Sequence, residues 1–206
     1  MKSLILSIIF MFSLSAREFG VNGFFLDLAD FNNDYRSSSN YNENRAYSYI
    51  KRINRNSSNT TARANAENIS LASECTQIDA IYLLAKVHKE STFYVNARSR
   101  TGAAGLSQMT GVAIQEVKDQ LGLRGTPYAR GSVIRSLKQD LRSCLGNDGF
   151  DELIGIYKNN SNYQIKQIYK RNIKQSLIAG AIILKVFMAK NYNPRLSLRE
   201  NYRNDL

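Results

Sequence analysis

The stretch that decides the fold runs from residue 90 to residue 108 and reads ESTFYVNARSRTGAAGLSQ. It follows a segment in which the apolar residues Ile78, Ile81 and Ala85 recur at the spacing of a helix face. Thr76 is a suitable N-cap for this segment. We therefore expect a buried helix that begins after Thr76 and ends near Glu90.

Glu90 closes this helix and precedes a glycine- and arginine-rich loop from Arg98 to Gly105, which places its carboxyl at the lip of a cavity. A carboxyl half-buried beside apolar groups has its neutral form favoured, as a general acid requires. Gln108, just beyond the loop, offers a donor and an acceptor to a ligand. On spacing alone, however, a lone Glu is more often a solvated surface charge.

The same stretch resembles the catalytic motif of the soluble lytic transglycosylases, relatives of goose-type lysozyme in the lysozyme-like superfamily. The matching positions are Glu90, Ser91, Phe93, Ala97, Ser99, Gly102, Ala103, Gly105, Leu106 and Gln108. A weaker similarity to a later helix of that family covers Asn172-Ile173, Ala179-Gly180-Ala181 and Leu184. The resemblance implies a mainly α, lysozyme-like catalytic domain over residues 73–206.

In function, the resemblance implies cleavage of the β-1,4 bond between N-acetylmuramic acid and N-acetylglucosamine in peptidoglycan. Most glycosidases pair two carboxylates, whereas this family resembles the exceptions in which one Glu acts as acid and then as base. No second acid lies near Glu90 in the sequence, because Asp79 is far back on the expected helix and Glu116 and Asp119 fall in a later one. These three are expected to be caps or surface charges.

The resemblance also assigns residues to the site. It implies Glu90 as the catalytic residue and sugar contacts from Ser99, Gly105, Leu106, Ser107 and Gln108, with no cofactor and no metal. The family's supporting Tyr, normally in a Tyr-Asn pair, corresponds best to Tyr202. The literal pair Tyr192-Asn193 comes too soon after Gly180 and runs into Pro194.

Two alternatives share this fold. If water replaces the muramoyl C6 hydroxyl as the attacking group, the enzyme is a hydrolytic lysozyme. If the chain kept the fold without the chemistry, it is a non-catalytic peptidoglycan-binding adaptor, which the departure from the Tyr-Asn pair favours. A basic nucleic-acid binder ranks third.

Composition limits the class of partner and excludes some metal sites. The chain has 206 residues, 28 Lys plus Arg and 17 Asp plus Glu, for a net charge of +11, which predicts an anionic partner. A hydrophobic fraction of 43% is enough for one domain with a core. Two Cys and one His exclude a four-cysteine or multi-histidine zinc site.

The first sixteen residues have the layout of a secretory signal peptide. Lys2 is followed by an apolar run from Leu4 to Leu14 and by Ser15-Ala16. The run is too short for a transmembrane anchor. We therefore expect a periplasmic or secreted protein whose anionic partner is the cell wall and its glycan strands rather than nucleic acid. Export also permits a disulfide between Cys75 and Cys144, although two buried free thiols fit equally well.

Residues 17–72 are rich in Asn and Ser and are expected to be a mostly extended tether. Short elements are expected only near Phe24 to Leu28 and near Ala46 to Ile53. Beyond residue 73 the apolar spacing predicts helices and almost no strand. These helices are expected at residues 107–120, 133–145, 150–157, 163–169 and 176–189. The sequence is silent on oligomeric state.

Overall fold

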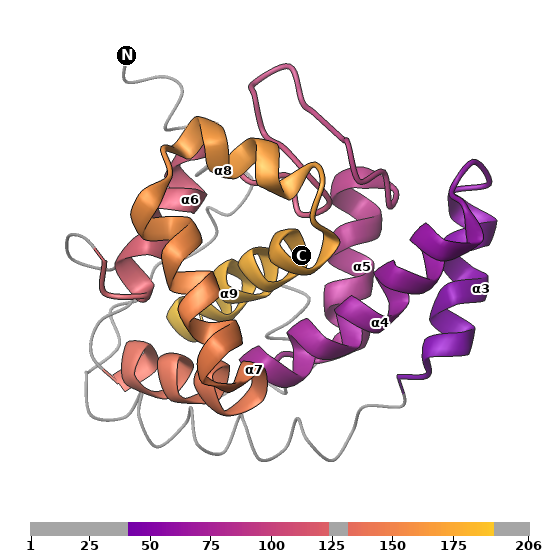
Figure 1. Cartoon of the computed structure of the whole chain (residues 1–206). Helices are drawn as coiled ribbons and strands as arrows, with labels where there is room; N and C mark the ends of the chain where they lie inside the picture. The colour runs from indigo at the N-terminus through magenta and orange to yellow at the C-terminus, as the bar shows by residue number, and fades with distance from the viewer. Residues whose placement is uncertain (1–40, 124–131, 192–206) are drawn as a thin grey trace.

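The computed structural model describes residues 41–123 and 132–191, and these ranges are mainly α-helical (Figure 1). The predicted fold class, mainly α, is confirmed at this level. In the described ranges there is no strand, only isolated bridges that join Ala104 to Arg98 and to Met109. The helices are α3 (Glu43–Ile53), α4 (Asn59–Thr76), α5 (Ala80–Ser91), α6 (Gly111–Gln120), α7 (Ser132–Asn159), α8 (Asn162–Tyr169) and α9 (Ile173–Asn191).

Helix α9 lies at the centre of the fold, and α4, α5, α6, α7 and α8 pack against it (Figure 1). It is apolar on every side over Leu177 to Ile182, where each residue is fully buried or nearly so. A helix that is hydrophobic all round belongs in a core. In the described ranges no helix alone is long and apolar enough to cross a bilayer. Only α8 and Ile173–Ala189 together reach that length and composition, and they are bent by 116°.

The expected tether is wrong for residues 43–72, because α3 and α4 are part of the core. Ser58 caps α4 by accepting a hydrogen bond from the Thr61 amide at 3.0 Å. Ile69 is fully buried, and α4 packs against α9, α7, α5 and α3. Apart from Ile69, the buried face of α4 consists of small or short residues: Ala62, Asn65, Ala66, Ala72, Cys75 and Thr76. The predicted domain boundary at residue 73 therefore falls inside a helix.

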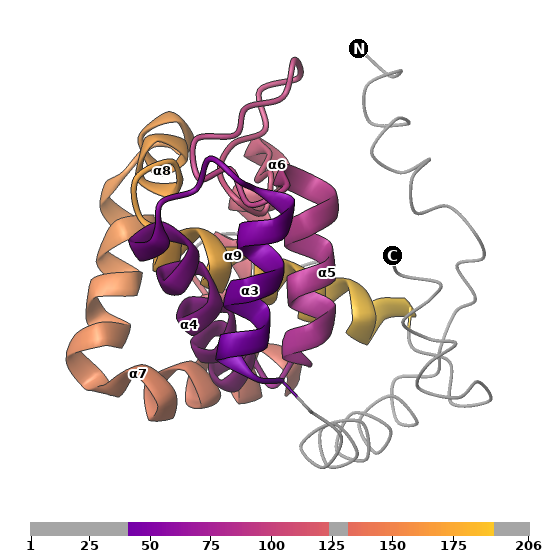
Figure 2. The ribbon, with the colours of Figure 1, turned by 90° about the vertical axis from the view of Figure 1, so that its right-hand side faces the viewer.

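Helix α3 confirms the short element expected near Ala46 to Ile53. Figure 2 shows α3 lying across α4 and beside α5. Ala46 and Ile50 are its buried residues, and the Tyr41 hydroxyl just before it donates to the carbonyl of Ala66 at 2.7 Å. These contacts fix α3 on the domain that carries Glu90.

Other helix ends differ from the sequence-based expectation. Helix α5 starts after Asp79, whose carboxylate accepts from the amides of Ile81 and Tyr82, while Thr76 is the last residue of α4. Helix α6 begins at Gly111, later than expected. The two helices expected at residues 133–145 and 150–157 are the halves of α7, which breaks at Gly146 with a φ of 72°.

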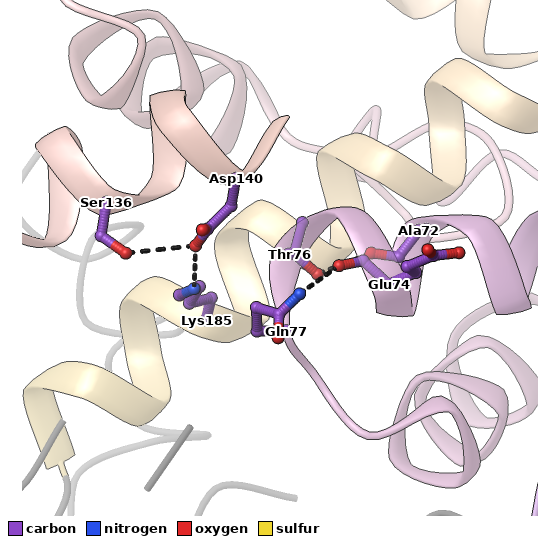
Figure 3. A network of polar contacts seen from close by, with 7 residues as sticks. All are labelled: Ala72, Glu74, Thr76, Gln77, Ser136, Asp140 and Lys185. Carbon is purple, nitrogen blue, oxygen red and sulfur yellow. Dashed lines mark hydrogen bonds and ion pairs between the residues drawn. The ribbon is translucent and has the colours of Figure 1, made fainter. Parts of the chain in front are cut away.

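A disulfide joins α7 to α4, and an ion pair joins α7 to α9. The predicted disulfide is formed between Cys75 of α4 and Cys144 of α7, whose Cα atoms are 5.1 Å apart, so the free-thiol alternative is wrong. Lys185 of α9, 1% exposed, lies 3.3 Å from the Asp140 carboxylate, which also accepts from Ser136 (Figure 3). Burial lowers the pKa of Lys185, and the attraction of Asp140 opposes that shift.

Several expectations lie outside the described residues. These are the signal peptide over residues 1–16, the short element near Phe24 to Leu28, the pair Tyr192-Asn193 and the supporting Tyr202.

Candidate active site at the end of α5

Glu90 lies in the last turn of α5, where the chain leaves the helix sharply. Thr92 and Phe93 follow with φ angles of 48° and 63°, so the backbone turns through the left-handed region twice. The amide of Thr92 donates to the carbonyl of His88 and closes the helix. Phe93 is fully buried, whereas the Glu90 side chain keeps 30% of its surface exposed. The carboxyl is therefore at the surface, at the start of the loop over residues 92–110.

The Glu90 carboxylate has a basic partner on its own helix. Lys86 Nζ lies 2.7 Å from Glu90 Oε1, an i,i+4 pair whose side chains are 20% and 30% exposed. On a helix, i,i+4 pairs of this type contribute only about 0.2–0.5 kcal/mol. A ligand that offers Glu90 a hydrogen bond can therefore displace Lys86 at little cost.

Backbone hydrogen bonds fold the loop onto itself. The amide of Gly105 donates to the carbonyl of Ala97, and Ala104 and Met109 exchange two hydrogen bonds. Ser99 closes the tip, since its hydroxyl accepts from the amide of Ala103 at 2.9 Å and bonds to Thr101. Lys166 of α8 donates to the carbonyl of Gly102 at 2.7 Å. The loop therefore has a defined conformation, held by its own hydrogen bonds and by one from α8.

The second half of the loop is anchored to α9. The amide of Leu106 donates to the Ser176 hydroxyl at 3.1 Å, and the Ser107 hydroxyl donates to the carbonyl of Ser176 at 3.1 Å. A Cβ on Gly180 would lie 2.0 Å from Ser107 Oγ, so only glycine permits this approach. Gly105, at φ 76°, is equally close to α8 and α9, because its Cβ would lie 2.8 Å from Ser176 Oγ and 3.0 Å from Tyr169.

This anchoring shows what the side chains of the predicted sugar-binding set contact in the fold. Leu106 is fully buried and Ser107 is 9% exposed with its hydroxyl engaged by α9, so both side chains support the loop from below. Gly105 is buried for the same reason. Ser99 and Gln108 remain partly accessible. Gln108, at φ 46°, donates from Nε2 to the carbonyl of Gly105 at 2.8 Å.

The predicted site residues thus divide into two groups. Glu90, Ser99 and Gln108 are partly accessible on the α5 end and its loop, while Gly105, Leu106 and Ser107 form the join between loop and α9. In the described ranges Glu90 pairs with Lys86 and Gln108 bonds to Gly105, so these two side chains engage different partners.

The other acids serve structural purposes, as expected. Asp79 is the N-cap of α5. Glu116 accepts from Gln120 and Asp119 accepts from Gln115, each at 2.8 Å within α6. Over residues 41–123 and 132–191, no group of three or more His, Cys, Asp or Glu side chains is arranged to hold a metal.

An aromatic cluster that the sequence did not predict joins α3 to α5 near the turn that follows Glu90. The Tyr49 hydroxyl and His88 Nδ1 are 2.7 Å apart, and the His88 ring stacks on Phe93 with centroids 5.8 Å apart. Asn54, just past α3, donates to the carbonyl of Phe93 at 3.2 Å. The cluster fixes the turn after Glu90.

A depression of about 350 Å³ lies on α3, lined by Asn44, Arg45, Ser48, Tyr49 and Arg52. We call it the α3 depression. Glu90 is not among its lining residues, but Tyr49 belongs to both the depression and the aromatic cluster.

Comparison of the chain with protein-family models, with curated proteins and with solved structures finds no match.

Proposed function

We propose that the chain is a peptidoglycan-cleaving glycosidase of the lysozyme-like type, a lytic transglycosylase that acts with Glu90 as its single acid and base. One observation carries the proposal: the two segments that resemble this family, separated along the chain, meet in space. Ser107 of the first segment packs onto Gly180 of the second, and Ser107 also donates to the carbonyl of Ser176. That contact supports the loop that follows Glu90.

In the proposed reaction Glu90 first acts as an acid. Its carboxyl gives a proton to the glycosidic oxygen as the bond from that oxygen to the muramoyl anomeric carbon breaks. The substrate's own 2-acetamido group stabilises the positive charge that develops on this carbon. Glu90 must release Lys86 to reach the glycosidic oxygen, and an i,i+4 pair on a helix is weak enough for this exchange.

Glu90 then acts as a base. Its carboxylate takes the proton from the muramoyl C6 hydroxyl as that oxygen bonds to the anomeric carbon, which closes a 1,6-anhydro ring and restores the carboxyl. The proposed sugar contacts on the loop over residues 92–110 are Ser99 and Gln108, which are both partly accessible. If water attacks instead, the product is an ordinary reducing end and the activity is that of a lysozyme.

The proposed setting is the periplasm or the cell exterior, with the anionic wall as partner. The support is the layout of residues 1–16 and the +11 net charge of the chain. The disulfide between Cys75 and Cys144 fits an oxidising compartment.

The test compares the parent with Glu90→Gln in the clearing of purified sacculi, with Glu152→Gln as the control. Glu152 is an exposed residue of α7, so its variant loses the same charge away from α5. We expect Glu90→Gln to lower the rate by about a hundredfold or more, because it removes a general acid, and Glu152→Gln to clear normally. Equal rates for the parent and Glu90→Gln would overturn the proposal.

A non-catalytic wall-binding adaptor is the second candidate. The observations that favour it are the Lys86 partner on Glu90 and the absence of Glu90 from the lining of the α3 depression. It predicts that the parent binds sacculi and releases no soluble muropeptide.

A further inference from the structure

The α3 depression is built from one face of a single helix. Arg45, Tyr49 and Arg52 recur at helical spacing along α3, and Asn44 and Ser48 form the adjacent row. The helix beneath is fixed, because Ala46 and Ile50 are buried in the core. The depression therefore presents its polar groups from a rigid base.

The lining of the depression carries a net positive charge, because within the part of the chain that the structure describes no negative side chain is among its residues to offset it. The pairs of Lys86 with Glu90 and of Lys185 with Asp140 involve none of the lining residues. A further guanidinium stands beside the lining, since Arg63 donates to Asn44 Oδ1 at 2.7 Å. Glu43, in the first turn of α3, is not one of the lining residues. An anion is the ligand that this lining fits.

The lining is also partly ordered. The Arg52 guanidinium lies over the Tyr49 ring, 5.4 Å from its centroid, and the Tyr49 hydroxyl is bonded to His88. A guanidinium held against an aromatic face loses less freedom when it binds a planar oxyanion. Arg45 and Arg52 are seven residues apart, or about 10 Å along the helix axis. Two guanidiniums so spaced fit an extended chain with several negative groups better than one compact phosphate.

The depression is close to the proposed site of cleavage. Tyr49 contacts His88, two residues before Glu90, and Asn54 at the end of α3 bonds to Phe93, three residues after it. A strand bound at the end of α5 would therefore pass near α3. The negative groups that a peptidoglycan strand itself carries are carboxylates. They lie on the peptide stems, and on the lactyl groups only where a stem has been removed, because a stem is joined to the lactyl carboxyl by an amide bond.

We propose that the α3 depression binds carboxylates of the peptidoglycan strand through Arg45 and Arg52. This inference rests on the proposed function for the identity of the strand, and it assigns α3 a role in holding substrate. Arginine suits it because its fork of donors pairs with a carboxylate in two parallel hydrogen bonds.

The experiment measures binding rather than cleavage, in the full chain carrying Glu90→Gln. The test variant adds Arg45→Gln and Arg52→Gln. The matched control adds Arg142→Gln and Lys158→Gln, exposed residues of α7 that remove the same charge. Each is incubated with intact sacculi, with sacculi whose peptide stems an amidase has removed, and with chitin, a related but uncharged glycan.

We expect the test variant to bind intact sacculi at least about tenfold more weakly, because one lost charge-assisted hydrogen bond is worth about that factor. The control should change little, and the two should bind chitin alike. A loss on intact sacculi alone assigns the stem carboxylates, and a loss of similar size on amidase-treated sacculi shows that the lactyl carboxylates freed by the amidase also bind. Equal losses in test and control, no loss in either, or an equal loss on chitin would overturn the proposal.

A competition experiment separates carboxylate from phosphate. Soluble muramyl dipeptide should displace the Glu90→Gln chain from sacculi, while inorganic phosphate at the same ionic strength should not. Displacement by phosphate alone would overturn the carboxylate assignment. If the parent releases no muropeptide but Arg-dependent, carboxylate-dependent binding is found, the proposed function fails and the α3 site stands.

Discussion

Ser107 occupies the space that a side chain on Gly180 would need: a Cβ there would lie 2.0 Å from Ser107 Oγ and 2.5 Å from Ser107 Cβ. Gly180→Ala is therefore expected to lower the free energy of unfolding by about 1–3 kcal/mol or more, as overpacking of a core does. Urea unfolding measures the change. Gly155→Ala is the control, because Gly155 has room in α7 and alanine there should stabilise by about 0.5–1 kcal/mol.

The double variant Ser107→Gly with Gly180→Ala tests whether the clash itself is the cause. Removing the Ser107 side chain makes room for the new methyl group. The double variant should therefore be more stable than the sum of the single effects predicts, by about 1 kcal/mol or more. Strict additivity of the two changes would contradict the packing described for this contact.

Ile69 tests whether α4 belongs to the core. It is fully buried, so Ile69→Ala should cost about 2–5 kcal/mol of stability. The matched control is Ile81→Ala, whose residue is 46% exposed and should cost far less. Thermal unfolding distinguishes the two. An Ile69 variant as stable as the parent would instead support the prediction that residues 43–72 are an extended tether.

The disulfide should contribute a large share of the stability. It joins residues 69 apart, for which loop-closure entropy predicts about 4 kcal/mol. Cys75→Ala with Cys144→Ala should lower the urea midpoint, and a reducing agent should lower that of the parent but not of the double variant. A parent midpoint that reducing agent leaves unchanged would contradict this prediction.

Lys185 gives a pH dependence of known sign. Burial lowers the pKa of Lys185 below 10.5 in the folded chain. Between that lowered pKa and pH 10.5, the unfolded chain binds more protons than the folded chain. The free energy of unfolding therefore rises with pH toward 10.5. Burial raises the pKa of Tyr41, Tyr157 and Tyr169, which opposes this trend increasingly as the pH nears and passes 10.0. Unfolding should therefore be measured from neutral pH to about 9.5.

Lys185→Met should remove that rise. It also leaves Asp140, whose side chain is 25% exposed, without its cation, and removing one partner of a buried pair costs up to about 3–5 kcal/mol of stability. The hydrogen bond from Ser136 and the partial exposure of Asp140 should reduce that cost. A parent and variant with the same slope of stability against pH would show that Lys185 does not titrate as described.

Apolar spacing predicted most of the helices but not α4. The runs before Glu90 and after Ile173 are apolar enough that their period is visible, and both became helices. In α4 the buried face combines three alanines with Asn65, Cys75 and Thr76, and Ile69 is its one large apolar residue. Its burial therefore leaves little trace in the hydrophobic pattern of the sequence. The Asn, Ser and Thr around it are typical of linkers, but here Ser58 acts as a helix cap.

The candidate site could be predicted in part. The position of Glu90 at a helix end follows from the periodicity before it and the glycines after it. The burial of Leu106 and Ser107 could not be foreseen, because it depends on Ser176 and Gly180 more than sixty residues away. The link from Tyr49 to His88 is also long-range, and no local pattern specifies it.

The most direct measurement of the central claim is mass spectrometry of the soluble products that the chain releases from purified sacculi. We predict muropeptides with 1,6-anhydro ends, lighter by one water than reducing-end products, from the parent and from Glu152→Gln, and none from Glu90→Gln. Reducing-end products would contradict the transglycosylase reaction. Equal release by Glu90→Gln, or no release by the parent, would contradict the role of Glu90 itself.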